Sequence, residues 1–157
     1  QQPFRFLPGW ASNFGGLVNA TFVDSDATYR VGGPAVVPGG PLVNVDRTST
    51  LFGLSEQAFN GTLYYDDETF SARVSVSYRD RFIDATGGTG NMFEGYNSTV
   101  NVDAAIRYQL TENFELSLEG INLTDEYRDR FVDIDANRAY ENNHFGRTIL
   151  FGVRYSL

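Results

Sequence analysis

The chain is constrained most strongly by an alternation of apolar and polar side chains with a period of two residues. In the closing stretch RTILFGVRYSL, one side of an extended chain carries Ile149, Phe151, Val153, Tyr155 and Leu157. The other side is mostly polar or small. Because successive side chains of a β-strand point to opposite faces, this stretch predicts a terminal strand with one apolar face.

The same alternation recurs throughout the chain, and no segment shows a sustained helical period. This pattern predicts an all-β fold with antiparallel strands. The five further segments that alternate are residues 16–23, 58–65, 69–80, 99–110 and 114–120.

The connections between these segments are of two kinds. Two are short, at 66–69 and 111–113, whereas the others are long, at 24–54, 83–98 and 125–144. We therefore expect short turns at one end of the sheet and long loops at the other.

The short connections also predict how the strands pair. A two-residue loop in the middle of DDET (66–69) would place Tyr65 opposite Phe70, and the loop at 111–113 would place Tyr108 opposite Leu116. Both pairings put the apolar sides on one face, as a correct register requires.

The polar side of the strands is rich in charge. We expect Arg107 to pair diagonally with Glu115 and Glu119 across this face, because diagonal neighbours lie ~7–8 Å apart. Such charges are typical of the wet lumen of a transmembrane barrel. The predicted lumen-wall residues are Arg73, Arg79, Asp103, Arg107, Glu115, Glu119 and Arg154.

Two architectures fit an alternating chain. A soluble sandwich or lipocalin-like barrel turns its apolar face inward, whereas a transmembrane barrel turns it toward lipid. The second also predicts short turns, long external loops and aromatic girdles near both interfaces. The sequence favours it, because aromatics occur at the expected positions: Tyr65, Phe70, Tyr108, Phe114 and Tyr155 near the short turns, and Phe22, Tyr78 and Phe82 near the long loops.

Composition narrows the possible partners. The chain has 157 residues, enough for one domain (1–157), and its net charge of −8 argues against nucleic acid, which requires a basic face. Cys is absent, so there are no disulfides and no thiolate chemistry.

Five short motifs occur in order along the chain: Leu7-Pro8-Gly9, Asn19-Ala20-Thr21, Tyr78-Arg79-Asp80, Asn122-Leu123-Thr124-Asp125 and Gly146-Arg147. With the runs SEQAFNGTLYYDDETFSARVSVSYRDRF and HFGRTILFGVRYSL, their order and spacing resemble the C-terminal end of a TonB-dependent outer-membrane receptor. Within this family, the motifs of this chain are similar to those of the branch often associated with carbohydrate uptake.

This resemblance implies a bacterial outer-membrane protein with a 22-stranded barrel and an N-terminal plug. Such receptors take up a scarce nutrient (a siderophore, cobalamin or an oligosaccharide), driven by TonB. This chain would supply the last six or seven strands, and the rest of the receptor would supply the plug and about sixteen strands. The barrel would contact lipid, and its terminal strand would be recognised by the assembly machinery. The usual last residue is Phe, where this chain has Leu157.

Two other classes remain open: a small passive or adhesive outer-membrane barrel, and a soluble all-β binding protein. We expect no enzyme activity, no cofactor and no metal. His144 is the single His, and the Asp133-Ile-Asp-Ala-Asn stretch lacks the Gly and Glu of a calcium loop.

The long segment 125–144 contains the candidate ligand-facing residues. Aromatic rings beside guanidinium groups suit a sugar or a chelate ligand. The competing interpretation is an aromatic girdle with an extracellular extension of the strands. The candidates are Tyr127, Arg128, Arg130, Phe131, Arg138 and Tyr140.

Overall fold

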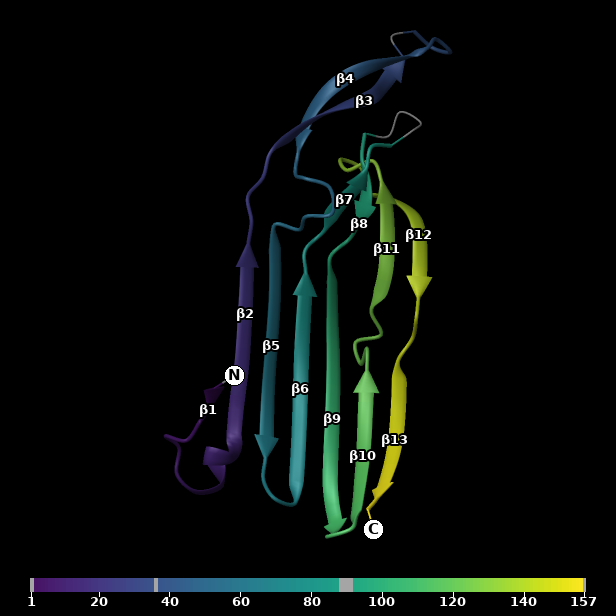
Figure 1. Ribbon diagram of the computed structural model, residues 1–157. Helices are drawn as coiled ribbons and strands as arrows, with labels where there is room; N and C mark the ends of the chain where they lie inside the picture. The colour runs from purple at the N-terminus through teal and green to yellow at the C-terminus, as the bar shows by residue number, and fades with distance from the viewer. Residues whose placement is uncertain (1, 36, 88–91, 157) are drawn as a thin grey trace.

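The computed structural model describes residues 2–35, 37–87 and 92–156, and its regular structure is almost entirely antiparallel β-strand (Figure 1). Thirteen strands and one short 3-10 helix, η1 (Gly9–Asn13), are present in this part of the chain. The all-β prediction is confirmed. The sheets are open, and no barrel closes among the described residues.

The largest sheet has seven strands, and we call it the wall sheet. It contains a strand for each of the six segments predicted from alternation. Its order is β1 (Gln2–Pro3), β2 (Phe14–Phe22), β5 (Gln57–Asp66), β6 (Phe70–Arg79), β9 (Thr99–Thr111), β10 (Phe114–Ile121) and β13 (Thr148–Tyr155).

The three long connections extend the wall at one end, while the tight turns lie at the other (Figure 1). They were predicted as loops, but all three contain antiparallel strands. β3 (Ala27–Ala35) and β4 (Leu42–Ser49) form a two-stranded ribbon. The strands of the other two connections form one four-stranded sheet, which we call the cap sheet. Its order is β12 (Arg138–His144), β11 (Tyr127–Val132), β8 (Glu94–Tyr96) and β7 (Phe82–Ala85).

The predicted register of the first hairpin is wrong by two residues. Tyr65 lies opposite Ala72 rather than Phe70. The turn forms one residue later than expected because the Asp67 carboxylate accepts hydrogen bonds from the backbone N–H groups of Thr69 (2.8 Å) and Phe70 (2.7 Å). A shift of two residues preserves the facing of every side chain, so the apolar faces still coincide.

The predicted register of the second hairpin is confirmed. Tyr108 lies opposite Leu116, and Arg107 lies opposite Ser117. A β-bulge between Phe114 and Glu115 absorbs the extra residue next to the turn.

The apolar face of the wall sheet is not covered by any other described part of the chain. Val18 is 84% exposed and Phe151 is 70% exposed, and large apolar side chains on β5, β6, β9 and β10 are also exposed. A water-soluble monomer rarely leaves so large an apolar surface uncovered. This face therefore needs a covering that the described residues do not supply.

The buried core lies elsewhere, between the ribbon and the cap sheet. Four hydrophobic side chains are buried among the described residues: Val31, Ile83, Phe93 and Phe131. Tyr29, Val45, Met92 and Ile134 pack against them. The ribbon and the cap sheet, which together we call the extensions, thus share a small core of their own.

The opposite face of the wall is polar, and one contact on it involves a glycine. The ring of Tyr64 lies across Gly15, in the space that a Cβ atom would need. On the apolar face, Gly61 has open space beside its Cα.

No helix in the described residues is long and apolar enough to cross a membrane.

Candidate functional site

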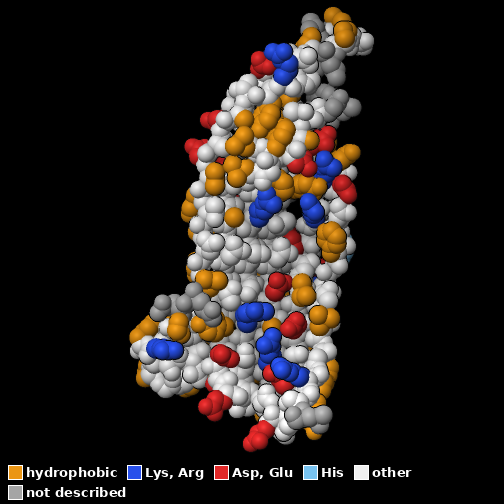
Figure 2. Space-filling view, viewed as in Figure 1, with side chains coloured by type: hydrophobic (Ala, Val, Ile, Leu, Met, Phe, Trp, Pro, Cys, Tyr) orange, Lys and Arg blue, Asp and Glu red, His pale blue; other side chains and the backbone are white. Residues whose placement is uncertain are grey.

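A pocket of about 420 Å³ lies where the polar face of the wall meets the cap sheet. We call it the junction pocket. Its floor comes from the ends of the wall strands, since Arg79, Thr99, Asn101, Ile121 and Thr148 all belong to the polar face by register. Basic side chains flank a hollow at this level in Figure 2.

The walls of the pocket come from the cap strands and from the segments that join cap to wall. They combine rings, amides and charged groups in a small space. The residues are Phe82, Tyr96, Asn97, Asn122, Glu126, Tyr127, Arg128, Phe145 and Gly146.

Two guanidinium groups line the pocket, and they are held differently. Arg79 lies 3.8 Å from the centroid of the Phe82 ring and donates to Ser55 Oγ (2.8 Å) and to the carbonyl of Gly53 (2.7 Å). Its donors are thus partly used in tying β6 to the segment before β5. The guanidinium of Arg128 lies 4.3 Å from the centroid of Tyr96, and no carboxylate of the described residues is within 4.0 Å of it.

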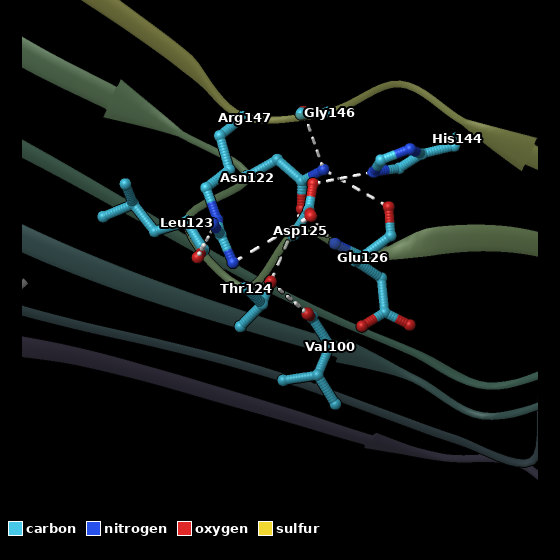
Figure 3. Close-up of polar contacts among 9 residues, drawn as sticks. All are labelled: Val100, Asn122, Leu123, Thr124, Asp125, Glu126, His144, Gly146 and Arg147. Atoms are coloured by element: carbon cyan, nitrogen blue, oxygen red, sulfur yellow. Dashed lines mark hydrogen bonds and ion pairs between the residues drawn. The ribbon is translucent and has the colours of Figure 1, made fainter.

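The rim of the pocket is fixed by a turn centred on Asn122, which has a positive φ of 54° (Figure 3). Asn tolerates this left-handed conformation better than most residues. The Asn122 amide nitrogen donates to the carbonyls of Gly146 (3.0 Å) and Glu126 (3.3 Å), and its Oδ1 accepts from the Glu126 N–H (2.8 Å). One side chain thereby joins the β10–β11 turn to the β12–β13 link.

The same turn is attached to β9. Thr124 Oγ1 donates to the carbonyl of Val100 (2.8 Å), and the Asn122 N–H donates to the Asp103 carboxylate (2.9 Å). The Leu123 N–H donates to the carbonyl of Val102 (2.8 Å). The pocket rim is therefore held against the wall by both backbone and side-chain bonds.

Asp125 connects the turn to the start of β13 (Figure 3). Its carboxylate lies 2.8 Å from His144 Nε2 and 4.0 Å from an Arg147 nitrogen. The His144 ring in turn stacks on Tyr127, with centroids 4.2 Å apart. His144 thus orients a pocket ring.

Only two of the six predicted ligand-facing residues, Tyr127 and Arg128, line the pocket. Phe131 does not face a ligand, because it is 1% exposed and belongs to the buried core. Arg138 lies 3.6 Å from Asp133 at the end of the cap, and Tyr140 is 60% exposed.

Arg130 is occupied within the cap sheet. Its guanidinium is 3.3 Å from Glu94 and 3.6 Å from Asp84, and it lies 5.4 Å from the centroid of the Tyr140 ring. Arg130 Nε and Asp84 Oδ1 are nonetheless buried without a hydrogen-bond partner in the described structure. The group links β7, β8 and β11, so its role here is structural.

By register, the predicted lumen-wall charges all lie on the polar face of the wall sheet. Figure 2 shows charged side chains distributed over one face of the molecule. Arg73, Asp103 and Glu119 surround one hollow, Arg107 and Glu115 another, and Glu115 and Arg154 a third. The predicted pairing of Arg107 with Glu115 and Glu119 is wrong: no ion pair within 4.0 Å joins them in the described structure.

The terminal strand keeps its apolar side on the apolar face. Ile149, Phe151, Val153 and Tyr155 are 55–70% exposed there. Leu157 lies outside the described residues.

The calcium-like stretch forms a tight turn. Asp133 Oδ1 accepts a hydrogen bond from the Ala136 N–H (3.3 Å), so this carboxylate is used within the turn. No group of three or more His, Asp or Glu in the described part of the chain is arranged to hold a metal ion.

The arrangement suits the binding of a small polar molecule with a ring. Ring faces, amide donors and acceptors, and a guanidinium without a carboxylate partner converge on one cavity. Sequence reasoning missed Tyr96 and Phe145 and placed Phe82 in an aromatic girdle, whereas Phe82 lies on β7 and lines the pocket. These rings come together only when β7, β8 and the β12–β13 link fold against the wall. The alternation did indicate that Asn101 belongs to the polar face.

Comparison of the chain with protein-family models, with curated proteins and with solved structures found no match.

Proposed function

We propose that this chain is the C-terminal segment of a TonB-dependent receptor barrel in a bacterial outer membrane, which imports a scarce nutrient. The observation that carries the proposal is the pattern of aromatic residues on the uncovered apolar face. The sequence resemblance described above supports it independently.

The aromatic residues of the apolar face form two belts. The first, near the tight turns, runs across all the long wall strands. Neighbouring rings are in contact range: Phe14 and Tyr65 have centroids 5.1 Å apart, and Tyr65 and Phe70 are 6.0 Å apart. The members of this turn-side belt are Phe14, Tyr65, Phe70, Tyr108, Phe114 and Tyr155.

The turn-side belt slopes across the strands. It steps down by two residues from β5 to β6 and by two more from β9 to β10. The whole descent is ~13 Å along the strands over ~24 Å across them, a slope of about 30°. Strands of outer-membrane barrels tilt by ≈ 35–45°, so a belt lying level with a membrane surface would slope in a similar way.

The second belt lies near the extensions. Phe22, Phe59 and Tyr78 contact one another, with centroids 5.3 Å and 5.7 Å apart. On β6 the distance from Phe70 to Tyr78 is ~26 Å along the strand, or about 23 Å along the membrane normal at this slope. The apolar band of a transmembrane barrel is ≈ 25 Å tall.

The rest of the fold agrees with this assignment. Charged side chains occupy the opposite face, which would line the lumen, and the extensions lie at one end of the wall, as external loops do. The receptor would complete the barrel with further strands paired to the free edges of β1 and β13, because unpaired backbone groups are costly in lipid.

Expression of the 157-residue chain by itself tests the proposal. The two open edges should prevent a detergent-stable monomer, so refolding in detergent should give no species whose gel mobility changes on heating. A folded, heat-modifiable monomer would refute the segment and favour a small barrel. A chain that stays monomeric without detergent would favour a soluble all-β protein.

A further inference from the structure

We infer that the junction pocket binds a uronate, a sugar ring that carries a carboxylate, and that Arg128 recognises the carboxylate. This inference rests on the proposed function for its setting, since the pocket would then open between the lumen and the external loops. It goes further by assigning a site, a ligand class and a residue that determines charge specificity.

The lining charges favour an anion. Two guanidinium groups and one carboxylate line the pocket, whereas the chain as a whole has a net charge of −8. The pocket is therefore a locally basic place in an acidic molecule. A carboxylate on the ligand would be attracted there and repelled by most of the remaining surface.

Arg128 is the residue best placed to bind that carboxylate. Its guanidinium carbon lies 4.3 Å from the centroid of the Tyr96 ring, a cation–π contact that holds the side chain at the pocket. No carboxylate of the described residues lies within 4.0 Å of this guanidinium, so its N–H groups can bind a ligand carboxylate with two parallel hydrogen bonds. Arg79 is a weaker candidate, because Ser55 and Gly53 already accept from it.

The uncharged lining favours a sugar ring. Phe145 lines the pocket and is 73% exposed, so an apolar sugar face can pack on its ring. One face of the Tyr127 ring is already stacked on His144. Asn97 and Asn101 can each donate and accept hydrogen bonds with hydroxyl groups. A cavity of about 420 Å³ falls within the range of small-ligand sites.

The experiment uses the full receptor purified in detergent, with galacturonate as the probe. Its methyl ester is the matched control, because it keeps the ring and removes the charge. Citrate is the second control, because it has carboxylates and no ring. Calorimetric titration should give galacturonate at least about tenfold tighter binding than either control, since hydrogen bonds to charged groups are the stronger kind.

The Arg128→Gln variant should lose this preference and bind galacturonate no better than the ester. The Arg138→Gln variant, which changes an arginine of the same cap sheet outside the pocket, should bind as the unaltered receptor does. Raising the salt concentration should weaken the binding of galacturonate to the unaltered receptor and leave that of the ester unchanged. This measurement needs no variant.

Equal affinity for galacturonate and its ester would overturn the inference, as would an unaffected Arg128→Gln receptor. Tighter binding of citrate would overturn the assignment of a ring. Heat modifiability and the need for detergent are measured on the same preparations. A heat-modifiable receptor that does not bind galacturonate would refute the assigned site alone. A protein that stays in solution without detergent and binds galacturonate would refute the membrane proposal alone.

Discussion

Val74 is the position where the assignment of the apolar face can be tested most directly. It lies on β6, a central strand of the wall, and is 47% exposed on the apolar face. It is midway between Phe70 and Tyr78, one in each aromatic belt, and so ~13 Å along the strand from both. If this face contacts lipid, Val74 lies close to the bilayer midplane.

An arginine at Val74 should therefore destabilise the receptor strongly. Arg on the lipid face near the midplane costs ~2–4 kcal/mol. This free energy corresponds to about a 30-fold to 700-fold lower ratio of folded to unfolded receptor. The measurement is the free energy of unfolding of the full receptor in lipid vesicles, from titration with denaturant.

The neighbouring Ser75→Arg variant is the control, because Ser75 lies on the polar face opposite Asp103. Its Oγ is 2.9 Å from Thr62 Oγ1, and losing this hydrogen bond should cost at most ~1 kcal/mol. A Ser75→Arg variant damaged more than Val74→Arg would reverse the assignment of the two faces.

A third substitution separates lipid from a protein core, since a buried arginine is costly in both. Val74→Phe should change stability little if the face contacts fluid lipid. In a packed core, the extra volume should cost ~1–3 kcal/mol. A loss of that size would show that this face packs against protein, and the soluble alternative would be favoured.

Three further changes have definite expected outcomes. Asn122→Ala should lower the free energy of unfolding by ~2–3 kcal/mol, because it removes four side-chain hydrogen bonds and places Ala at a positive φ. The Tyr65 hydroxyl and two backbone N–H groups hold the pKa of Asp67 below its usual range. The Asp67→Asn receptor should therefore lose less stability than the unaltered one as pH falls below ~4. Gly15→Ala should cost at most ~1 kcal/mol, because the atoms in its way are the far end of the Tyr64 side chain, which can move aside, and Tyr64→Ala should relieve much of that cost.

Each change has a matched control measured by the same denaturant titration. Asn143→Ala loses one exposed hydrogen bond, to Glu141, and should have a small effect. Glu68→Gln alters the next residue of the turn and keeps the Asp67 carboxylate with its three hydrogen bonds, so the loss of stability at low pH that depends on Asp67 should persist. Gly61→Ala should be tolerated, because space is open there. A control that matched its partner's effect would contradict the corresponding contact.

The sequence was sufficient to predict the wall strands and the facing of their side chains. Alternation is a local property, and Val74 and Ser75 illustrate how adjacent letters already assign opposite faces. The first hairpin register could not be predicted fully. It depends on where the turn closes, and there the Asp67 side chain accepts hydrogen bonds that shift the turn by one residue.

The cap and the junction pocket were predicted less well, for a different reason. The cap strands are short and have no sustained alternation, so YRDRFV gives no sign that Phe131 is buried while Arg128 is exposed. Burial there is decided by β3, β7 and the residues before β8, which are distant in sequence. The junction pocket depends on the same distant contacts, because its walls come from β7, β8, β11 and the link between β12 and β13.

The uncovered apolar face also has a consequence for how such a chain changes over generations. If this face contacts fluid lipid, as proposed, its surroundings have no fixed shape and place no demand on the volume or branching of a side chain, only on its polarity. Leu63, Val74 and Ile106 could be exchanged for one another at little cost, whereas Ile83 and Phe131 must fit each other's outline. Mutations should thus exchange one apolar residue for another on the wall sheet, while the alternation of apolar and polar residues is preserved. In two related proteins with such a sheet, the alternation of apolar and polar residues and the turn around Asn122 would therefore remain recognisable longest.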